Sequence, residues 1–207
     1  LGALISMLLI NNLIRRLGEG RSTVISLIVY GFLMIAPIVM PTYVTLCTAL
    51  FFVGFAMGWV DISMNAVANT LEKLDDVKIM STSHGFFSLG GIAGGVIGGI
   101  LAEFAVDPFL QMSFGCLMLI LTVLLIVNPA LGKIHDTSNS DHNVIFALPS
   151  RPLLGLSVIA FCIMMAEGAI TDWSTVYLSI TLGSSAAVAG FGFAIFSTMM
   201  TLGRFNG

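Results

Sequence analysis

The chain has 207 residues, of which 57% are hydrophobic and only 9% are charged, and its mean hydropathy is +1.03. A soluble domain carries roughly 25% charged residues, so this composition excludes an ordinary water-soluble protein. The net charge of −3 arises from scattered acidic residues, which argues against a nucleic-acid-binding protein.

Long apolar runs recur along the chain, and a run of about 20 residues crosses a hydrocarbon core of about 30 Å as a helix. Short polar, proline or glycine breaks separate seven such segments. They fall near residues 1–14, 24–40, 44–71, 82–105, 110–131, 152–178 and 186 onward. The first segment is shorter than the ~17 residues that a span needs, and it begins with Leu1. We therefore predict an all-α polytopic membrane protein, present as an internal fragment of a longer chain with about seven transmembrane segments.

The basic residues predict the orientation of these segments. All eight Lys and Arg residues fall in alternate connections, at 15–21, 72–78, 133–151 and near Arg204. The connections between them contain none. Because Lys and Arg stay on the cytoplasmic side of a membrane, the connections that carry them are predicted to be cytoplasmic.

The longest polar stretch, "GKIHDTSNSDHN" at 132–143, is typical of a solvated linker. It separates five segments from the last two. Two histidines within it, His135 and His142, are interpreted as solvated loop residues in preference to metal ligands. The three cysteines lie singly in apolar runs, so neither a disulfide framework nor a metal site is predicted, and no cofactor is expected.

Asp61 is the first charged residue after an apolar run that begins at Val44. It lies ten residues before the end of its segment, about 15 Å into the membrane, where a charge costs about 2.5–3.5 kcal/mol. At about 100° per residue, Asn65, Asn69 and Glu72 share its side of the helix. Lipid cannot satisfy such a polar stripe. It therefore indicates either a binding site for substrate or protons, or a hydrogen-bonded anchor between helices.

Glu167 raises the same question in the segment that begins at Pro152. Counting about 1.5 Å per residue places it roughly 22 Å from the cytoplasmic side, in the outer half of the membrane. Both a cavity role and a role as a polar cap at the outer end are open. Further along, Trp173 and Tyr177 suit an interfacial aromatic belt.

Two other polar residues have two interpretations each. His84, at the cytoplasmic end of its segment, is either a proton relay or an interfacial structural residue. Arg204 is either a residue whose charged end reaches the membrane interface or the buried partner of an acid.

Glycines gather in "HGFFSLGGIAGGVIGGILAE" in two rows of four-residue spacing. One row is Gly90, Gly94 and Gly98, and the other is Gly91, Gly95 and Gly99. Rows of small residues let helix backbones approach closely inside a membrane. They predict a tight helix–helix seam, which is either static or slides during a transport cycle.

The strings "GWVDISMNAVANTLE", "SHGFFSLGGIAGGVIGG", "EGAITDWSTVYL" and "TLGRFNG" resemble the major facilitator superfamily over essentially the whole chain. The resemblance is closest to a bacterial inner-membrane branch related to fucose permease-type sugar:proton symporters. It implies twelve spans in two six-helix halves, with a substrate site near the midplane. On that plan residues 1–131 cover the end of span 2 to span 6, residues 132–151 form the central cytoplasmic loop, and residues 152–207 contain spans 7 and 8.

The resemblance also implies roles for particular residues. The loop "RRLGEGR" retains Arg16, Gly18 and Arg21 of the family's cytoplasmic motif, but Arg15 stands where an acid is expected. Asp61 matches the span-4 carboxylate that takes part in proton coupling.

The function implied is a secondary active transporter, a symporter that moves a small polar solute with protons across the inner membrane by alternating access. Its partners would be the solute, protons and the lipid bilayer. No nucleophile elbow or HExxH motif occurs, so we do not predict an enzyme. The alternatives are a non-transporting scaffold or sensor on the same fold, and a membrane-embedded enzyme.

Overall fold

A computed structural model describes residues 1–131 and 151–206, and within them all regular secondary structure is helical. The all-α prediction is therefore confirmed for this part of the chain. The predicted central loop, with His135 and His142, lies outside the described residues except for Arg151, which begins a helix.

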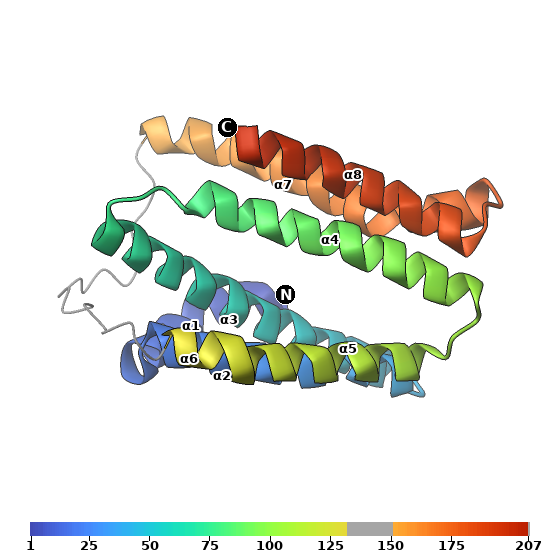
Figure 1. Cartoon of the computed structure of the whole chain (residues 1–207), viewed down its shortest axis with the longest axis horizontal. Coiled ribbons are helices and arrows are strands. Elements are labelled where there is room, and N and C mark those ends of the chain that lie inside the picture. Colours follow the sequence, from blue (N-terminus) through green and yellow to red (C-terminus); the bar gives the residue numbers. More distant parts are fainter. Residues whose placement is uncertain (132–150, 207) are drawn as a thin grey trace. The chain divides into compact units, whose positions relative to one another are not determined.

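The helices follow the predicted apolar segments (Figure 1). In chain order they are α1 (Gly2–Leu17), α2 (Glu19–Leu33), the 3-10 turn η1 (Ala36–Val39), α3 (Tyr43–Asp75), α4 (Met80–Glu103), α5 (Pro108–Thr122), the π-helical turn η2 (Val123–Val127), α6 (Asn128–Leu131), α7 (Arg151–Val176), the π-helical turn η3 (Tyr177–Thr181) and α8 (Ala186–Asn206).

Six helices in the described ranges are long and apolar enough to cross a membrane. They are Glu19–Val39, Tyr43–Asp75, Met80–Glu103, Pro108–Leu131, Leu153–Thr181 and Ala186–Phe205. The remaining segment, α1, has 16 residues and matches the short first segment that the sequence predicts.

Local chemistry explains where the helices begin. Thr42 and Thr45 form a reciprocal capping box at the start of α3. The Asp107 carboxylate accepts a hydrogen bond from the Leu110 N–H at 3.1 Å, and Pro108 occupies the first turn of α5.

The connection predicted at 15–21 is almost entirely helical, because one residue is enough to separate α1 from α2. Gly18 has φ 82° and ψ 153°, a conformation that is open essentially only to glycine. Its N–H donates to the Ile14 carbonyl at 2.8 Å, and its carbonyl accepts from the Ser22 N–H at 3.0 Å. The chain therefore turns without a polar loop.

The helices form two compact units. The first contains α1, α2, α3 and the continuous helix α5–η2–α6, and the second contains α4, α7, η3 and α8. Membership does not follow chain order, since α4 packs with the two later helices. The division by sequence into half bundles at 1–131 and 152–207 stays a prediction.

In the first unit α1 packs closely on α3. A Cβ added to Gly58 would lie 2.9 Å from the Ala3 carbonyl oxygen and 3.1 Å from the Ser6 Cβ, so only glycine permits this approach. The buried core of this unit contains Ile10, Ile14 and Trp59.

In the second unit α4 and α8 run antiparallel. Near one end, an added Cβ on Gly99 would lie 3.3 Å from the Ala187 carbonyl oxygen; further along, one on Gly91 would lie 2.9 Å from the Ser197 hydroxyl. By contrast, an added Cβ on Gly90 or Gly94 would have no atom within 4 Å. Of the two predicted glycine rows, the row Gly91, Gly95 and Gly99 therefore forms the seam with α8.

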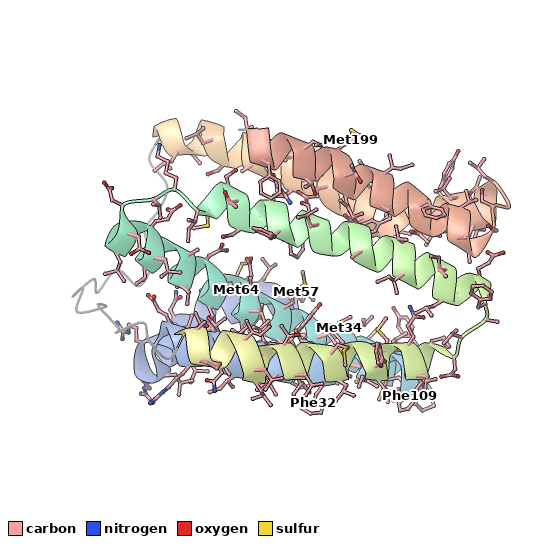
Figure 2. The ribbon with its side chains drawn as sticks, viewed as in Figure 1. Phe32, Met34, Met57, Met64, Phe109 and Met199 are labelled. Carbon is pink, nitrogen blue, oxygen red and sulfur yellow. The ribbon has the colours of Figure 1, made fainter. Side chains whose placement is uncertain are left out.

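Large apolar side chains cover the outer surfaces of the helices, among them Phe32, Phe109 and Met199 (Figure 2). In water such surfaces would be strongly unfavourable. They fit a protein whose solvent is the hydrocarbon core of a membrane.

Candidate functional site

The side chain of Arg204 is the centre of a polar cluster in the second unit. Its Nη2 donates to both carboxylate oxygens of Glu167, at 3.1 and 3.2 Å. Its Nη1 donates to the Ser88 hydroxyl at 2.5 Å and to the His84 main-chain carbonyl at 3.3 Å. One guanidinium group thus joins α8 to α7 and to α4.

In this cluster the Arg204 side chain is paired with an acid, which favours the second of its two interpretations. The Arg204 and Glu167 side chains are 20% and 19% exposed, and Ser88 is buried. The pair is therefore largely, but not completely, screened from its surroundings.

The structure gives the position of Glu167 along its helix. The candidate span Leu153–Thr181 has 29 residues, and Glu167 lies 14 residues from each of its ends. The estimate from sequence counted from Pro152 and assumed a span of about 20 residues, which placed Glu167 in the outer half. In the described helix Glu167 is midway between the two ends, and its depth in a membrane stays a prediction.

Two residues expected near this site contribute differently. His84 takes part through its main-chain carbonyl and not through its imidazole ring. Trp173 lies six residues beyond Glu167 on α7, and its side chain is 67% exposed. The sequence did not single out Ser88, although its position one turn after His84 in "SHGFFS" was a usable signal.

Asp61 lies in the first unit near the middle of α3, 18 residues after Tyr43 and 14 before Asp75. The Asn65 side-chain amide donates to the Asp61 carboxylate at 3.2 Å. Asp61 is exposed, whereas Trp59 and Ser63, roughly 160° away around the helix, are buried. Among the described residues no basic side chain pairs with Asp61.

The predicted polar stripe divides into two parts. Asp61 and Asn65 bind each other, and Asn69 is exposed on the next turn. Glu72 instead accepts hydrogen bonds from the main-chain N–H groups of Ile79 and Met80, at 2.7 and 2.8 Å. Its role is therefore to close the loop that follows α3.

The predicted cytoplasmic motif, with Arg16, Gly18 and Arg21, lies where α1 meets α2. Gly18 supplies the turn described above. Next to it, the Glu19 carboxylate accepts a hydrogen bond from the Thr70 hydroxyl at 2.6 Å, which connects the motif to α3. Nothing in the sequence pattern singles out Thr70, because threonine is common in membrane helices.

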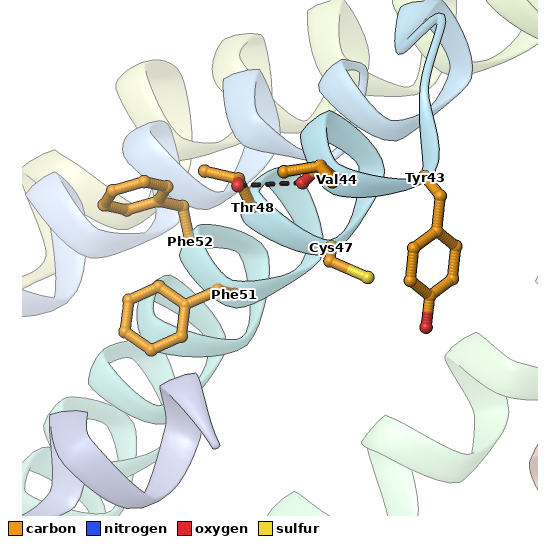
Figure 3. A pocket seen from close by; sticks show the side chains of 6 residues that line it. All are labelled: Tyr43, Val44, Cys47, Thr48, Phe51 and Phe52. Carbon is orange, nitrogen blue, oxygen red and sulfur yellow. Dashed lines mark hydrogen bonds between the residues drawn. The ribbon is translucent and has the colours of Figure 1, made fainter.

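Metal binding and a pocket are further features to consider in the described ranges. No group of three or more His, Cys, Asp or Glu residues there is arranged to hold a metal ion. A shallow apolar pocket of about 480 Å³ lies at the start of α3, far along the helix from Asp61 (Figure 3). Its lining residues are Tyr43, Val44, Cys47, Thr48, Phe51 and Phe52.

In the described ranges, six helices long and apolar enough to cross a membrane define a polytopic helical membrane protein, and Asp61 and Glu167 lie near the middle of two of them. The sequence profile of the Major Facilitator Superfamily matches residues 1–207, and the chain belongs to this superfamily. The predicted superfamily is therefore confirmed, and the fucose permease-type branch stays a prediction.

Three curated bacterial proteins are similar to the chain. An uncharacterized MFS-type transporter of Yersinia pestis is 36% identical over 82% of this chain and 44% of its own length. An uncharacterized transporter of Sinorhizobium fredii is 31% identical over 99% of the chain and 54% of its own length. The membrane protein MosC of Rhizobium meliloti is 28% identical over 100% and 50%. The chain spans about half the length of these relatives, and no solved structure gives a significant match.

Proposed function

We propose that the chain is part of a secondary active transporter in a bacterial inner membrane, which moves a small polar solute, such as a sugar, together with protons by alternating access. Membership of the superfamily supports this proposal, as do two relatives that are described as transporters. On this proposal the protein binds and releases its solute chemically unchanged and is not an enzyme.

The observation that carries the proposal is the position of Asp61. A carboxylate in the middle of a 33-residue apolar helix needs a polar environment or a proton. It is exposed, and its hydrogen-bonding partner in the structure is the neutral Asn65 amide. A carboxylate that only anchored two helices would be expected to lie in a helix interface, as Ser63 does on the buried side of α3.

Asp61 would act as the proton carrier. When it takes up a proton it becomes neutral, and a neutral group moves through an apolar environment at much lower cost than a charged one. Asn65 and Asn69 would then offer amide donors and acceptors to the hydroxyl groups of the solute. Binding of the solute and of the proton would be linked because both contact the Asp61 carboxylate.

The test uses the full-length protein that contains this chain, purified and reconstituted into proteoliposomes. A solute is first found by thermal-shift screening with a panel of sugars and polyols. Asp61→Asn is then compared with Asp75→Asn, which makes the same change in an exposed residue at the end of the same helix. We expect Asp61→Asn to abolish accumulation driven by a pH gradient and Asp75→Asn to retain it. Parental accumulation by Asp61→Asn would show that Asp61 does not carry the proton.

A further inference from the structure

We infer that Arg204 binds the carboxylate group of an anionic solute, and that protonation of Glu167 makes Arg204 available for it. This inference rests on the proposed transport function and makes it more specific, since it predicts that a proton and a monoanion enter together.

The two halves of the Arg204 guanidinium group have different kinds of partner. Nη1 is held by neutral acceptors on α4, the Ser88 hydroxyl and the His84 main-chain carbonyl. Nη2 faces the charged acceptor, the Glu167 carboxylate on α7. If Glu167 becomes protonated, the contacts of Nη1 that fix Arg204 in place are unchanged, and the negative charge that neutralises the guanidinium group is lost.

The charge balance then favours an anion. With Glu167 ionised, the pair is neutral as a unit. A proton on a Glu167 carboxylate oxygen leaves one positive charge on a side chain that is only 20% exposed, and a charge without a counter-ion at such a position is costly. A monoanion at the free Nη2 edge restores neutrality, and a carboxylate matches the planar donor geometry of arginine. Proton and carboxylate therefore bind cooperatively.

No other charged side chain on α4, α7 or α8 in the described ranges pairs with Arg204 or Glu167, so the net charge of the site is set by these two residues. On α4 the nearest titratable side chain is His84, which is exposed. On α7 the nearest is Asp172, five residues beyond Glu167 and about 140° away around the helix. On α8 Arg204 itself is the only charged residue among those described.

Contacts other than the ion pair also hold α4 against α8. The Ser81 hydroxyl donates to the Arg204 main-chain carbonyl at 2.7 Å at one end. The Glu103 carboxylate accepts from the Ala187 N–H at 3.2 Å at the other, with the glycine seam between them. A buried ion pair whose only role is structural can often be replaced by apolar residues without loss of stability. An additional role therefore accounts better for this pair, in which Glu167 lies midway along the candidate span Leu153–Thr181 and Arg204 lies near the end of the candidate span Ala186–Phe205.

The experiment measures binding to the purified full-length protein in detergent, so it needs no transport assay. The probes are formate, the smallest carboxylate, and gluconate, with formamide and sorbitol as their uncharged counterparts. For the parent protein we expect both carboxylates to raise the melting temperature, with an affinity that falls about tenfold per pH unit once Glu167 is ionised, since one proton is bound per anion. Formamide and sorbitol should not show this dependence.

Variants separate the two residues. Glu167→Gln keeps the shape of the side chain but removes its charge, so we expect it to bind formate with an affinity that does not change with pH. The double variant Glu167→Gln with Arg204→Gln should not bind formate. If formate binding to the parent protein is absent or independent of pH, the inference is wrong. The measurement of formate binding against pH uses only the parent protein. It therefore tests the inference even if a variant fails to fold.

The result is separable from the test of the transport function. Accumulation of an uncharged solute that depends on Asp61, without any pH-dependent carboxylate binding, would support transport and overturn the role of Arg204. Binding of formate with the expected pH dependence and Arg204 requirement, in a protein that accumulates no solute, would support the anion site and contradict the proposed transport.

Discussion

The Trp59 indole N–H donates a hydrogen bond to the Ser22 hydroxyl at 2.8 Å, and this hydroxyl also shares a hydrogen bond with Ser63 at 3.1 Å. All three side chains are buried in the interface between α2 and α3. Lipid-like surroundings provide little hydrophobic drive for helices to associate, so polar contacts of this kind contribute to their pairing. Ser22 is central because it bonds to both of the others.

We therefore expect Ser22→Ala to destabilise the protein by about 1–2 kcal/mol, since it leaves the buried indole N–H without its acceptor. The matched control is Ser26→Ala, one turn further along the same helix. Ser26 is equally buried, but its hydroxyl bonds to the Thr23 carbonyl within its own helix. Unfolding of the full-length protein in mixed detergent micelles would measure both variants. Equal losses of stability would show that the contact between the helices contributes nothing specific.

The glycine seam gives a second prediction. A Cβ on Gly190 would lie 2.6 Å from the Gly95 carbonyl oxygen and 2.8 Å from the Gly99 Cα, which are both main-chain atoms that cannot move aside cheaply. We expect Gly190→Ala to force α4 and α8 apart and to lower stability by about 1–3 kcal/mol.

Gly94→Ala is the control for that prediction, because its Cβ would meet no atom within 4 Å. Alanine is also the better helix former by about 1 kcal/mol, so this variant should be as stable as the parent protein or more so. The melting temperatures of the parent protein, Gly94→Ala and Gly190→Ala, measured on the purified proteins, would test this prediction. A Gly94→Ala variant as unstable as Gly190→Ala would mean that both glycine rows are packed.

The sequence was sufficient for the number and order of the helices, because apolar length is a local property. It was not sufficient to choose between the glycine rows, since both have the same spacing and only the position of α8 distinguishes them. The partners of Arg204 could not be predicted from the sequence either, because they come from other helices: Glu167 is 37 residues away along the chain and Ser88 is 116 away. Asn65 was predictable beside Asp61, because residues four apart in a helix are neighbours.

Glu72 provides a third prediction. Its carboxylate accepts hydrogen bonds from two consecutive main-chain N–H groups, those of Ile79 and Met80. Glu72→Ala should leave both donors without this partner and loosen the loop after α3. Glu72→Gln retains an acceptor oxygen and should preserve most of the order, with some loss because bonds to a charged acceptor are stronger. Hydrogen exchange of residues 76–80 would measure the effect, and equal exchange in the Ala and Gln variants would contradict this role of the side-chain oxygen.

Gly18 provides the last prediction, at the turn between α1 and α2. Its φ of 82° with ψ of 153° lies in a region that side chains with a Cβ rarely enter. Gly18→Ala should therefore cost about 1–3 kcal/mol and disturb the hydrogen bonds that join the turn to Ile14 and Ser22. Gly203→Ala is the control, since Gly203 lies within α8 and its added Cβ would meet no atom within 4 Å. Thermal unfolding of both full-length variants would separate them. If Gly18→Ala were as stable as Gly203→Ala, the turn would have to adopt a different backbone conformation from the one described here.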